Sequence, residues 1–264
     1  HIGKFPAVII APDDSEIVRE GSDVRRKWMD GVISQYDRTY LEKLIDYKKA
    51  VYQRNNLFKY FAENRLWDPS LIEPWDARIT PNAVFIARSR KEFIKDFLPV
   101  FINVYNEICG GEEEVSLEYI SNVPSNEDEF MELLKTSQVD DRRLRRMTCG
   151  VHKDDLAFKI GDYPLRKFGS QGQQKTFLVA LKLAQLVFLE KATGVKPILL
   201  LDDIFDKIDD KRVRALMSRV TDGTFGQIFI TDTHLGRIPE MFKSIGVDVR
   251  VFEVISGEVY TLDV

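Results

Sequence analysis

The sequence predicts an α/β protein that carries a mainly helical insertion. A short apolar run at residues 7–10, closed by Pro12 and two aspartates, predicts a buried strand and a turn close to the start. From about residue 22 to residue 112 the chain is polar and periodic, which favours helices. From residue 113 onwards, strand and helix patterns alternate. Such alternation is typical of a sheet covered by helices.

The insertion is expected to begin with two helices over residues 22–61, because apolar side chains recur near one helical face. Three prolines then predict a loop region, and a third helix follows until Gly110 and Gly111 stop it. Pro99 is expected to kink that helix. The apolar residues at helical spacing are Leu41, Leu44, Val51, Phe58, Phe93, Phe97, Phe101, Val104 and Ile108, and the loop prolines are Pro69, Pro74 and Pro81.

The rest of the chain is expected to form the sheet and the helices that cover it. Alternating or apolar segments at 115–119 and 156–160 predict strands, with a short acidic helix at 126–136 between them. The elements predicted further along are a helix that begins at Ser170, strands at 198–201 and 227–230, helices at 211–220 and near Pro239, and strands at 249–254 and 259–262.

The composition excludes several classes of function. Lys and Arg number 38 and Asp and Glu number 42, so a nucleic acid would have to bind at a local basic patch. The two cysteines and three histidines are scattered, which excludes a zinc site built on them. No apolar run reaches the length of a membrane span, and the first residues lack the layout of a signal peptide. We therefore expect a cytoplasmic protein.

The stretch from Gly169, GSQGQQKT, looks like a phosphate-binding P-loop in which Gln174 replaces the required second glycine. Ser170 and Gln173 instead have the spacing of a capping box before a long apolar helix. A helix start with a serine hydroxyl, a small Gly172 and free backbone N–H groups can bind an anion. On this stretch alone, an ordinary capped core helix is an equally good interpretation.

The segment PILLLDD at residues 197–203 is an apolar strand that ends in two carboxylates. Sheets of the α/β type bind ligands at the carboxyl ends of their strands. There Asp202 could hold Mg²⁺ and Asp203 could orient or deprotonate a water molecule. A second acidic turn, IFDKID, follows and ends at Asp209. Two acids after an apolar strand also occur by chance. The neighbouring segments are therefore needed to interpret the pair as a functional site.

The order of capped helix, acidic strand and acidic turn resembles the ABC-type ATPase family, with its signature motif, Walker B strand and D-loop. The resemblance implies that Ser170, Gly172 and Gln173 form the signature, which contacts the γ-phosphate of ATP held by a partner subunit. It also implies ATP and Mg²⁺ as cofactors, Asp203 as the catalytic residue and Asp209 as the D-loop acid. Gln171 departs from the usual first glycine.

Two further blocks, AVIIAPDDSEIVREGSDVRRKWMD and GVHKDDLAFKI, together with SQGQQKTFLVALKLAQ, resemble the RecF family of SMC-related ATPases. The resemblance implies a homodimer that forms with ATP, engages double-stranded or gapped DNA and helps to load RecA through partners such as RecR. A protein related to SMC proteins, with a structural or partner-binding role and no ATPase activity, is the alternative. The intact acids at 202, 203 and 209 favour the ATPase.

The chain contains no P-loop of the pattern G-x-x-x-x-G-K-[ST]. The RecF family has this Walker A loop before the PDD block, so we expect a C-terminal fragment that is inactive alone. The expected fold is a partial ABC-type ATPase core, without the P-loop strands, and with an inserted helical arm. We expect the ATPase lobe to start at 1–21, the arm to span 22–112, and the core with signature, Walker B and D-loop to span 113–264.

Several other residues have two interpretations each. His234 follows the strand after the Walker B segment and is either a switch histidine that contacts a γ-phosphate or a surface histidine. Asp13 and Asp14 occupy the place of the Q-loop, lack its glutamine, and are expected to cap a helix. His152 and Lys153 are expected to tie the core together near the signature helix.

Six arginines are the candidates for DNA binding. Four of them form two doublets that would share one face if the segment is helical. The alternative for all six is solvated charge balanced by nearby acids. The arginines are Arg142, Arg143, Arg145, Arg146, Arg25 and Arg26, and the balancing acids are Asp140, Asp141 and Glu20.

Overall fold

The computed structural model describes residues 4–111, 113–202, 226–233, 237–244 and 249–262. The strands are β1 (Ala7–Ile10), β2 (Val115–Ile120), β3 (Asp155–Ile160), β4 (Tyr163–Pro164), β5 (Ile198–Asp202), β6 (Ile228–Thr231), β7 (Val251–Ile255) and β8 (Glu258–Leu262). The helices are α1 (Glu16–Arg19), α2 (Ser22–Tyr36), α3 (Arg38–Asn64), α4 (Glu73–Cys109), α5 (Glu127–Leu144), α6 (Leu165–Phe168), α7 (Gln171–Thr193) and α9 (Arg237–Ser244), with 3₁₀ turns η1 (Pro12–Ser15), η2 (Pro69–Leu71) and η3 (Val151–Lys153).

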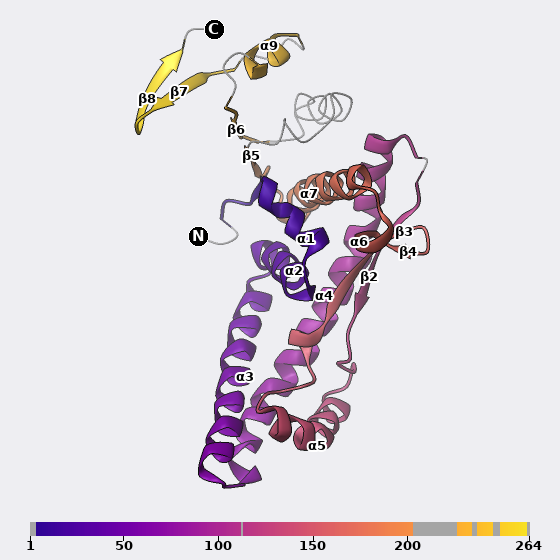
Figure 1. Ribbon diagram of the computed structural model, residues 1–264, viewed down its shortest axis with the longest axis vertical. Coiled ribbons are helices and arrows are strands. Elements are labelled where there is room, and N and C mark those ends of the chain that lie inside the picture. Colours follow the sequence, from indigo (N-terminus) through magenta and orange to yellow (C-terminus); the bar gives the residue numbers. More distant parts are fainter. Residues whose placement is uncertain (1–3, 112, 203–225, 234–236, 245–248, 263–264) are drawn as a thin grey trace.

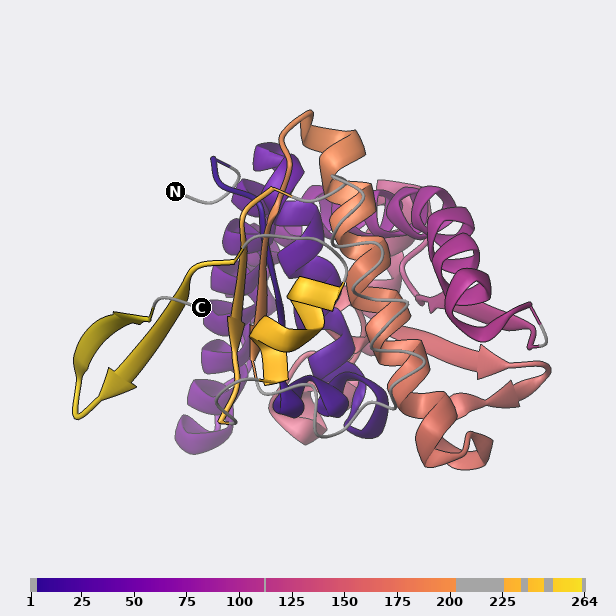
Figure 2. The same cartoon turned by 90° about the horizontal axis from the view of Figure 1, so that it is seen from above.

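A parallel sheet of order β1-β5-β6 lies against α7 (Figure 2). The register places Val8 beside Leu199 and Leu199 beside Ile228, so these side chains share the face that packs into the core. On the opposite face, Ile9 and Phe229 remain half exposed. Because all three strands are parallel, their carboxyl ends meet at one edge of the sheet, as the alternating pattern predicted.

Two other sheets are antiparallel. Strands β2, β3 and β4 form a curved ribbon that runs along α4, and β7 pairs with β8 in a hairpin (Figure 1). The two strands predicted at 115–119 and 156–160 are therefore neighbours, with Leu117 opposite Phe158. Both side chains are buried in the main core. The β2–β3 pair thus brings the segment after α4 next to the segment before α7.

The long helices α3 and α4 lie side by side and form an elongated arm (Figure 1). The C-terminal half of α4 leaves α3 and packs on α7 through aromatic rings: Phe97 lies 5.7 Å from Phe188, and Phe101 lies 4.7 Å from Phe177, between ring centroids. One buried apolar cluster therefore joins helices of the arm to the sheet. The domain limits at 22 and 112 stay a prediction.

The predicted proline loop is wrong in part, because α4 already begins at Glu73. Pro74 stands in its first turn, where no backbone N–H is needed, and the helix continues through Pro81 and Pro99. Buried side chains such as Ile79 and Ala83 flank Pro81, so burial offsets the lost hydrogen bond. The glycine stop is confirmed: Gly110 caps α4 in the left-handed region, with φ of 79°.

The acidic helix predicted at 126–136 is longer in the structure. α5 begins after Asn126, whose side chain accepts a hydrogen bond from the Asp128 amide, and continues to Leu144. Phe130 and Leu134 bury one side of this helix against the arm. Among the helices of the described ranges, none is long and apolar enough to cross a membrane.

Candidate functional site

Ser170 is the N-cap of α7, as the sequence predicted. Its backbone is extended (φ −60°, ψ 162°), and its Oγ accepts a hydrogen bond from the Gln173 amide at 3.2 Å. The Gln173 Oε1 atom accepts a reciprocal bond from the Ser170 amide at 2.8 Å. The two residues therefore form a complete capping box, and α7 starts at a fixed position.

The start of α7 is open to solvent. Ser170 and Gln171 are exposed, and Gly172 adds no side chain that would cover the first turn. The amides of Gln171 and Gly172 belong to the first turn of the helix, where backbone donors have no intrahelical acceptor. Since the Ser170 oxygen already accepts a bond, its proton can be donated outward. This arrangement offers several donors and the positive end of a 23-residue helix to an anion.

The second predicted group lies at the carboxyl edge of the parallel sheet. Asp202 is the last residue of β5 and is exposed, and its register partner on β6 is Thr231. The Thr231 hydroxyl donates a hydrogen bond of 2.6 Å to the Asp202 carboxylate. The predicted residues Asp203, Asp209 and His234 lie outside the described residues. The structure thus describes one of the two acids that the sequence analysis assigned to a Walker B strand.

A buried lysine, which the sequence analysis missed, fixes α7 to the end of β1. Lys182 is only 7% exposed, and its Nζ lies 2.5 Å from Asp14 Oδ1 and 3.1 Å from the Ile9 carbonyl oxygen. The other oxygen of Asp14 accepts the Ala11 amide at 2.8 Å. Asp14 is therefore the third residue of η1 and bonds to the N-cap residue Ala11, whereas the sequence predicted an aspartate as the N-cap itself. The lysine within the apolar run FLVALKLAQLVF could have predicted this contact, because a buried lysine needs an acidic or carbonyl partner.

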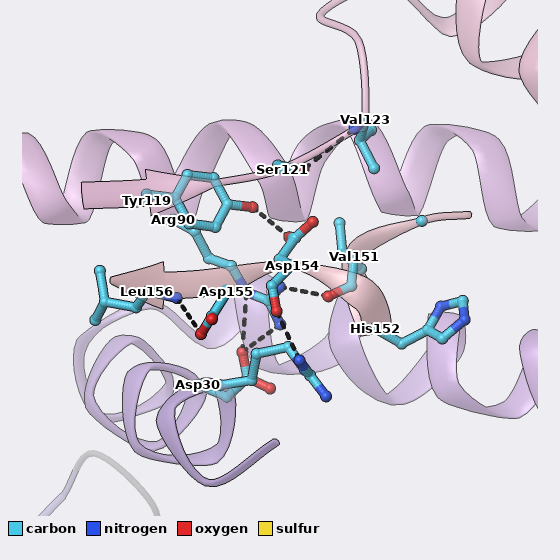
Figure 3. A network of polar contacts seen from close by, with 12 residues as sticks. Asp30, Arg90, Tyr119, Ser121, Val123, Val151, His152, Asp154, Asp155 and Leu156 are labelled. Carbon is cyan, nitrogen blue, oxygen red and sulfur yellow. Dashed lines mark hydrogen bonds and ion pairs between the residues drawn. The ribbon is translucent and has the colours of Figure 1, made fainter. Parts of the chain in front are cut away.

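Asp154 of the HKDD segment (residues 152–155) belongs to a buried ionic network, which Figure 3 shows. The Arg90 guanidinium lies 2.8 Å from carboxylate oxygens of both Asp30 and Asp154, and donates to the Val151 carbonyl at the same distance. Tyr119 donates its hydroxyl proton to Asp154. Burial raises the pKa of Asp154 above its ordinary value. The network joins α2 and α4 to the turn before β3.

His152 has a structural role, but its partners differ from those predicted. Its Nε2 lies 3.2 Å from the Met147 carbonyl oxygen, which can only accept, so Nε2 carries the proton. Nδ1 then accepts the Tyr47 hydroxyl at 2.7 Å. Burial lowers the pKa of His152 to about 4. The histidine therefore ties η3 to α3 rather than to α7, and Lys153 is exposed.

The four clustered arginines are exposed, but they do not share a helical face. Helix α5 ends at Leu144, and Arg145 adopts the left-handed conformation with φ of 53°. Within the helix, Arg142 lies over the ring of Trp67 at 4.7 Å, and Arg143 pairs with an acid of its own helix. The four are Arg142, Arg143, Arg145 and Arg146, and the acid paired with Arg143 is Asp140.

Asp141, expected to balance these arginines, is instead fully buried. One carboxylate oxygen lies 2.5 Å from the Arg54 guanidinium, and the other accepts the amide and hydroxyl of Thr148. Arg54 also contacts Asp76 at 2.6 Å. The charge of Asp141 is therefore neutralised inside the arm, and the exposed arginines keep more of their positive potential than the sequence indicated.

The other two arginine candidates bond within the fold. Arg25 forms a bidentate pair with Asp155 at 2.8 and 3.0 Å, and Arg26 donates to the Asp154 carbonyl at 2.6 Å. The nearby Glu20 contributes its backbone carbonyl to Arg25. These contacts attach α2 to the start of β3. Both guanidinium groups thus have partners that compete with any nucleic acid.

The chain is similar to known proteins over nearly its whole length. No protein-family model matches the chain. A DNA replication and repair protein RecF from Flavobacterium johnsoniae is 47% identical over 254 residues, which cover 96% of this chain and 70% of the relative. The RecF protein of Parabacteroides distasonis is 43% identical over 263 residues, which cover all of this chain and 70% of that protein.

Solved structures give the same result for the fold. Two structures of the recombination mediator protein RecF of the RecFOR pathway, one with ATPrS and one with ATP, each match with a TM-score of 0.85 and 28% identity. Each match covers 99% of this chain and 69% of the solved chain. With these likenesses in sequence and in structure, the chain belongs to the RecF family of DNA replication and repair proteins and has the fold of an ABC-type ATPase core.

Proposed function

We propose that this chain acts in a DNA recombination and repair ATPase in which the start of α7 contacts ATP held by a second copy of the protein. The observation that carries the proposal is the solvent-open capping box of Ser170 and Gln173. Its free donors are suited to the terminal phosphate of a nucleotide. The related solved proteins contain ATP or ATPrS, which supports ATP as the ligand.

The carboxyl edge of the sheet supplies the second half of the proposed chemistry. Asp202 is exposed and has the Thr231 hydroxyl beside it, and one or two carboxylates with nucleotide phosphates are the usual ligands of Mg²⁺. We assign Asp202 to the metal and Asp203 to the water molecule that attacks the γ-phosphate. We assign Asp209 to the D-loop, and His234 is the candidate for the switch.

The P-loop required by this scheme has the pattern G-x-x-x-x-G-K-[ST], which the 264 residues do not contain. The chain spans about 70% of the length of its relatives. We therefore place the loop in the remainder of the natural protein. One copy would supply the P-loop and its partner would supply Ser170, so ATP would join two subunits.

DNA and partner proteins complete the proposal. The relatives are named for DNA replication and repair, and the related structures for the RecFOR pathway. We propose that the ATP-bound dimer engages gapped or double-stranded DNA in the cytoplasm and helps to load RecA with RecR. The exposed arginines in the last turn of α5 and directly after it are the basic patch that supports DNA binding. They are Arg142, Arg143, Arg145 and Arg146.

Mixing two inactive variants tests the shared site. Ser170→Arg in the natural protein should abolish ATP-dependent dimerisation while each monomer still binds ATP, because the substitution blocks only the partner's phosphate. A variant with a defective P-loop should be equally inactive. Together they can form a heterodimer with one complete site, so ATPase activity and an ATP-dependent dimer should return. Light scattering and phosphate release are the measurements.

The 264-residue chain alone provides the control. It carries Ser170 without a P-loop, so it should show neither ATP hydrolysis nor an ATP-dependent dimer. Hydrolysis by this chain alone would contradict the shared site. If Ser170→Arg leaves hydrolysis and dimerisation of the natural protein unchanged, the structural or partner-binding role without ATPase activity becomes the better account.

A further inference from the structure

The side chain of Gln173 is bonded at both ends of its amide. Its Oε1 accepts the Ser170 amide at 2.8 Å, and its Nε2 donates to Glu113 Oε1, also at 2.8 Å. Glu113 lies between α4 and β2, 60 positions away in the sequence. The neighbouring Glu114 carbonyl accepts the Gly161 amide at 2.8 Å, which attaches this segment to the end of β3.

The Glu113 carboxylate is in turn held from inside the protein. Tyr105 of α4 is fully buried and donates its hydroxyl proton to the second oxygen, Oε2. The Tyr105 ring lies 5.9 Å from Phe101 and 6.1 Å from Phe177, between centroids. Burial raises the pKa of the Tyr105 hydroxyl, so it stays protonated and able to donate. The chain of contacts therefore leads from the core to the exposed cap of α7.

This chain of bonds decides which way the Gln173 amide faces. An amide group has one accepting end and one donating end. The Ser170 N–H needs an acceptor and the Glu113 carboxylate needs a donor. A flipped amide would set donor against donor and acceptor against acceptor, and both bonds would be lost. The capping box alone leaves the amide NH₂ group without a fixed partner, whereas Glu113 supplies one.

We propose that Glu113 and Tyr105 are positioning residues that hold Gln173 in its capping orientation and so hold Ser170 ready for the phosphate of a nucleotide bound to the partner subunit. The inference rests on the proposed function and adds a positioning contact, which runs from Tyr105 of α4 through Glu113 to the predicted signature. Neither residue touches the nucleotide. Their effect is on how often the cap has the competent geometry.

The expected effect of losing the Glu113 contact on the ATP-dependent dimer follows from the strength of an N-cap. An N-cap contributes about 1 kcal/mol, so freeing it lowers the competent fraction about fivefold. A dimer with two such sites should then dissociate about 30-fold more readily, because both caps must be ordered on closure. ATP binding to the monomer should not change. Each subunit binds ATP with its own P-loop, and its cap contacts only the ATP that the partner holds.

Three variants of the natural protein test the proposal. Glu113→Ala should weaken the ATP-dependent dimer by this factor and lower kcat, with the ATP affinity of the monomer unaltered. Glu113→Gln keeps an oxygen for the Gln173 amide and should restore most of the dimer affinity. Tyr105→Phe removes the second bond and should give an intermediate loss. The exposed neighbour Glu114→Ala is the matched control and should behave as wild type.

A double variant separates positioning from any other effect of the carboxylate. In a Gln173→Ala background, Glu113→Ala should have no further effect on dimerisation, measured by analytical ultracentrifugation at saturating ATP. A further loss there, a wild-type dimer in Glu113→Ala, or a failure of Glu113→Gln to restore it would overturn the inference. A tighter dimer in Glu113→Ala would also do so, because it would mean that the negative charge opposes the nucleotide.

The two proposals fail in different ways. If Ser170→Arg has no effect on the ATP-dependent dimer, the proposed function itself is wrong. If Ser170→Arg abolishes the dimer and Glu113→Ala leaves it intact, the proposed function stands and the role of Glu113 is refuted. Thermal unfolding of each variant accompanies the assay, so that a loss of dimer in a folded protein is distinguished from a loss of fold.

Discussion

Replacing Arg90 by methionine should destabilise the protein severely, because this guanidinium neutralises two buried carboxylates. Arg90 is 2% exposed, Asp154 is 1% exposed and Asp30 is 7% exposed. The substitution keeps an apolar side chain of similar length but removes the bonds to Asp30, Asp154 and the Val151 carbonyl. Removing one partner of a buried ion pair costs about 3–5 kcal/mol, since the remaining charges stay away from water.

The expected change in melting temperature follows from the size of the chain. For a protein of this length, 1 kcal/mol shifts the midpoint by about 2–4 °C, so Arg90→Met should melt about 6–20 °C lower. Urea unfolding followed by circular dichroism gives the free energy directly. Arg78→Ala is the matched control, since Arg78 also belongs to α4 and also pairs with an aspartate of another helix, Asp46, but its side chain is half exposed. Arg78→Ala should lower the free energy of unfolding much less than Arg90→Met does.

The pH dependence identifies the cause. The pKa of Asp154 is already raised in the folded protein by burial, and losing Arg90 should raise it further. A carboxyl with a raised folded pKa stabilises the fold below its unfolded pKa and loses that contribution as pH rises through the folded value. The difference in free energy of unfolding between the wild type and Arg90→Met should therefore shrink by about 1–2 kcal/mol when the pH is lowered from 7.5 to 5. Each pKa unit is worth about 1.4 kcal/mol.

A second substitution offers a rescue. Asp154→Asn should destabilise the wild type, but in the Arg90→Met background it should restore part of the lost stability by removing one unpaired charge. A deficit below 1 kcal/mol, a deficit that does not change with pH, or a double variant less stable than Arg90→Met would refute the reasoning. The network would then be accessible to water in solution.

Two further predictions concern His152 and the arginine cluster. The pKa of His152 is lowered by burial from 6.5 to about 4, so the unfolded chain binds a proton first as the pH falls, and stability should drop by about 2 kcal/mol between pH 7 and pH 5. Urea unfolding of His152→Gln at both pH values should show a smaller drop, and an equal drop would exclude His152 as the source. Replacing the four exposed arginines by alanine in the natural protein should weaken DNA binding and lower the slope of log K against log salt by up to about 0.9 per phosphate contact, measured by fluorescence anisotropy. Alanine at the exposed Arg38 and Arg78 is the control. An unchanged slope after replacing the four arginines would mean that they are solvated surface charges and do not contact DNA. The four arginines are Arg142, Arg143, Arg145 and Arg146.

The features that the sequence predicted well depend on contacts over a few residues. The Ser170 cap is one example, because its two hydrogen bonds join positions three apart. The stop of α4 at Gly110 and the strand that ends in Asp202 are others, since left-handed glycine and apolar runs act locally. Prolines misled the prediction where tertiary burial outweighed a local preference. Pro81 lies inside α4 for that reason.

Long-range pairing was decided by the tertiary structure alone. One interpretation of the sequence makes Asp141 a surface acid that balances the arginines, and folding instead buries it against Arg54, 87 positions away. Arg90 meets Asp154 across 64 positions, and Glu113 meets Gln173 across 60. Charge and spacing in a sequence show which side chains can pair, but the packing of α3, α4 and α7 determines which of them meet. By itself, therefore, the sequence determined the helix that begins after Ser170 and its cap, whereas the burial of charges far apart in the chain needed the fold.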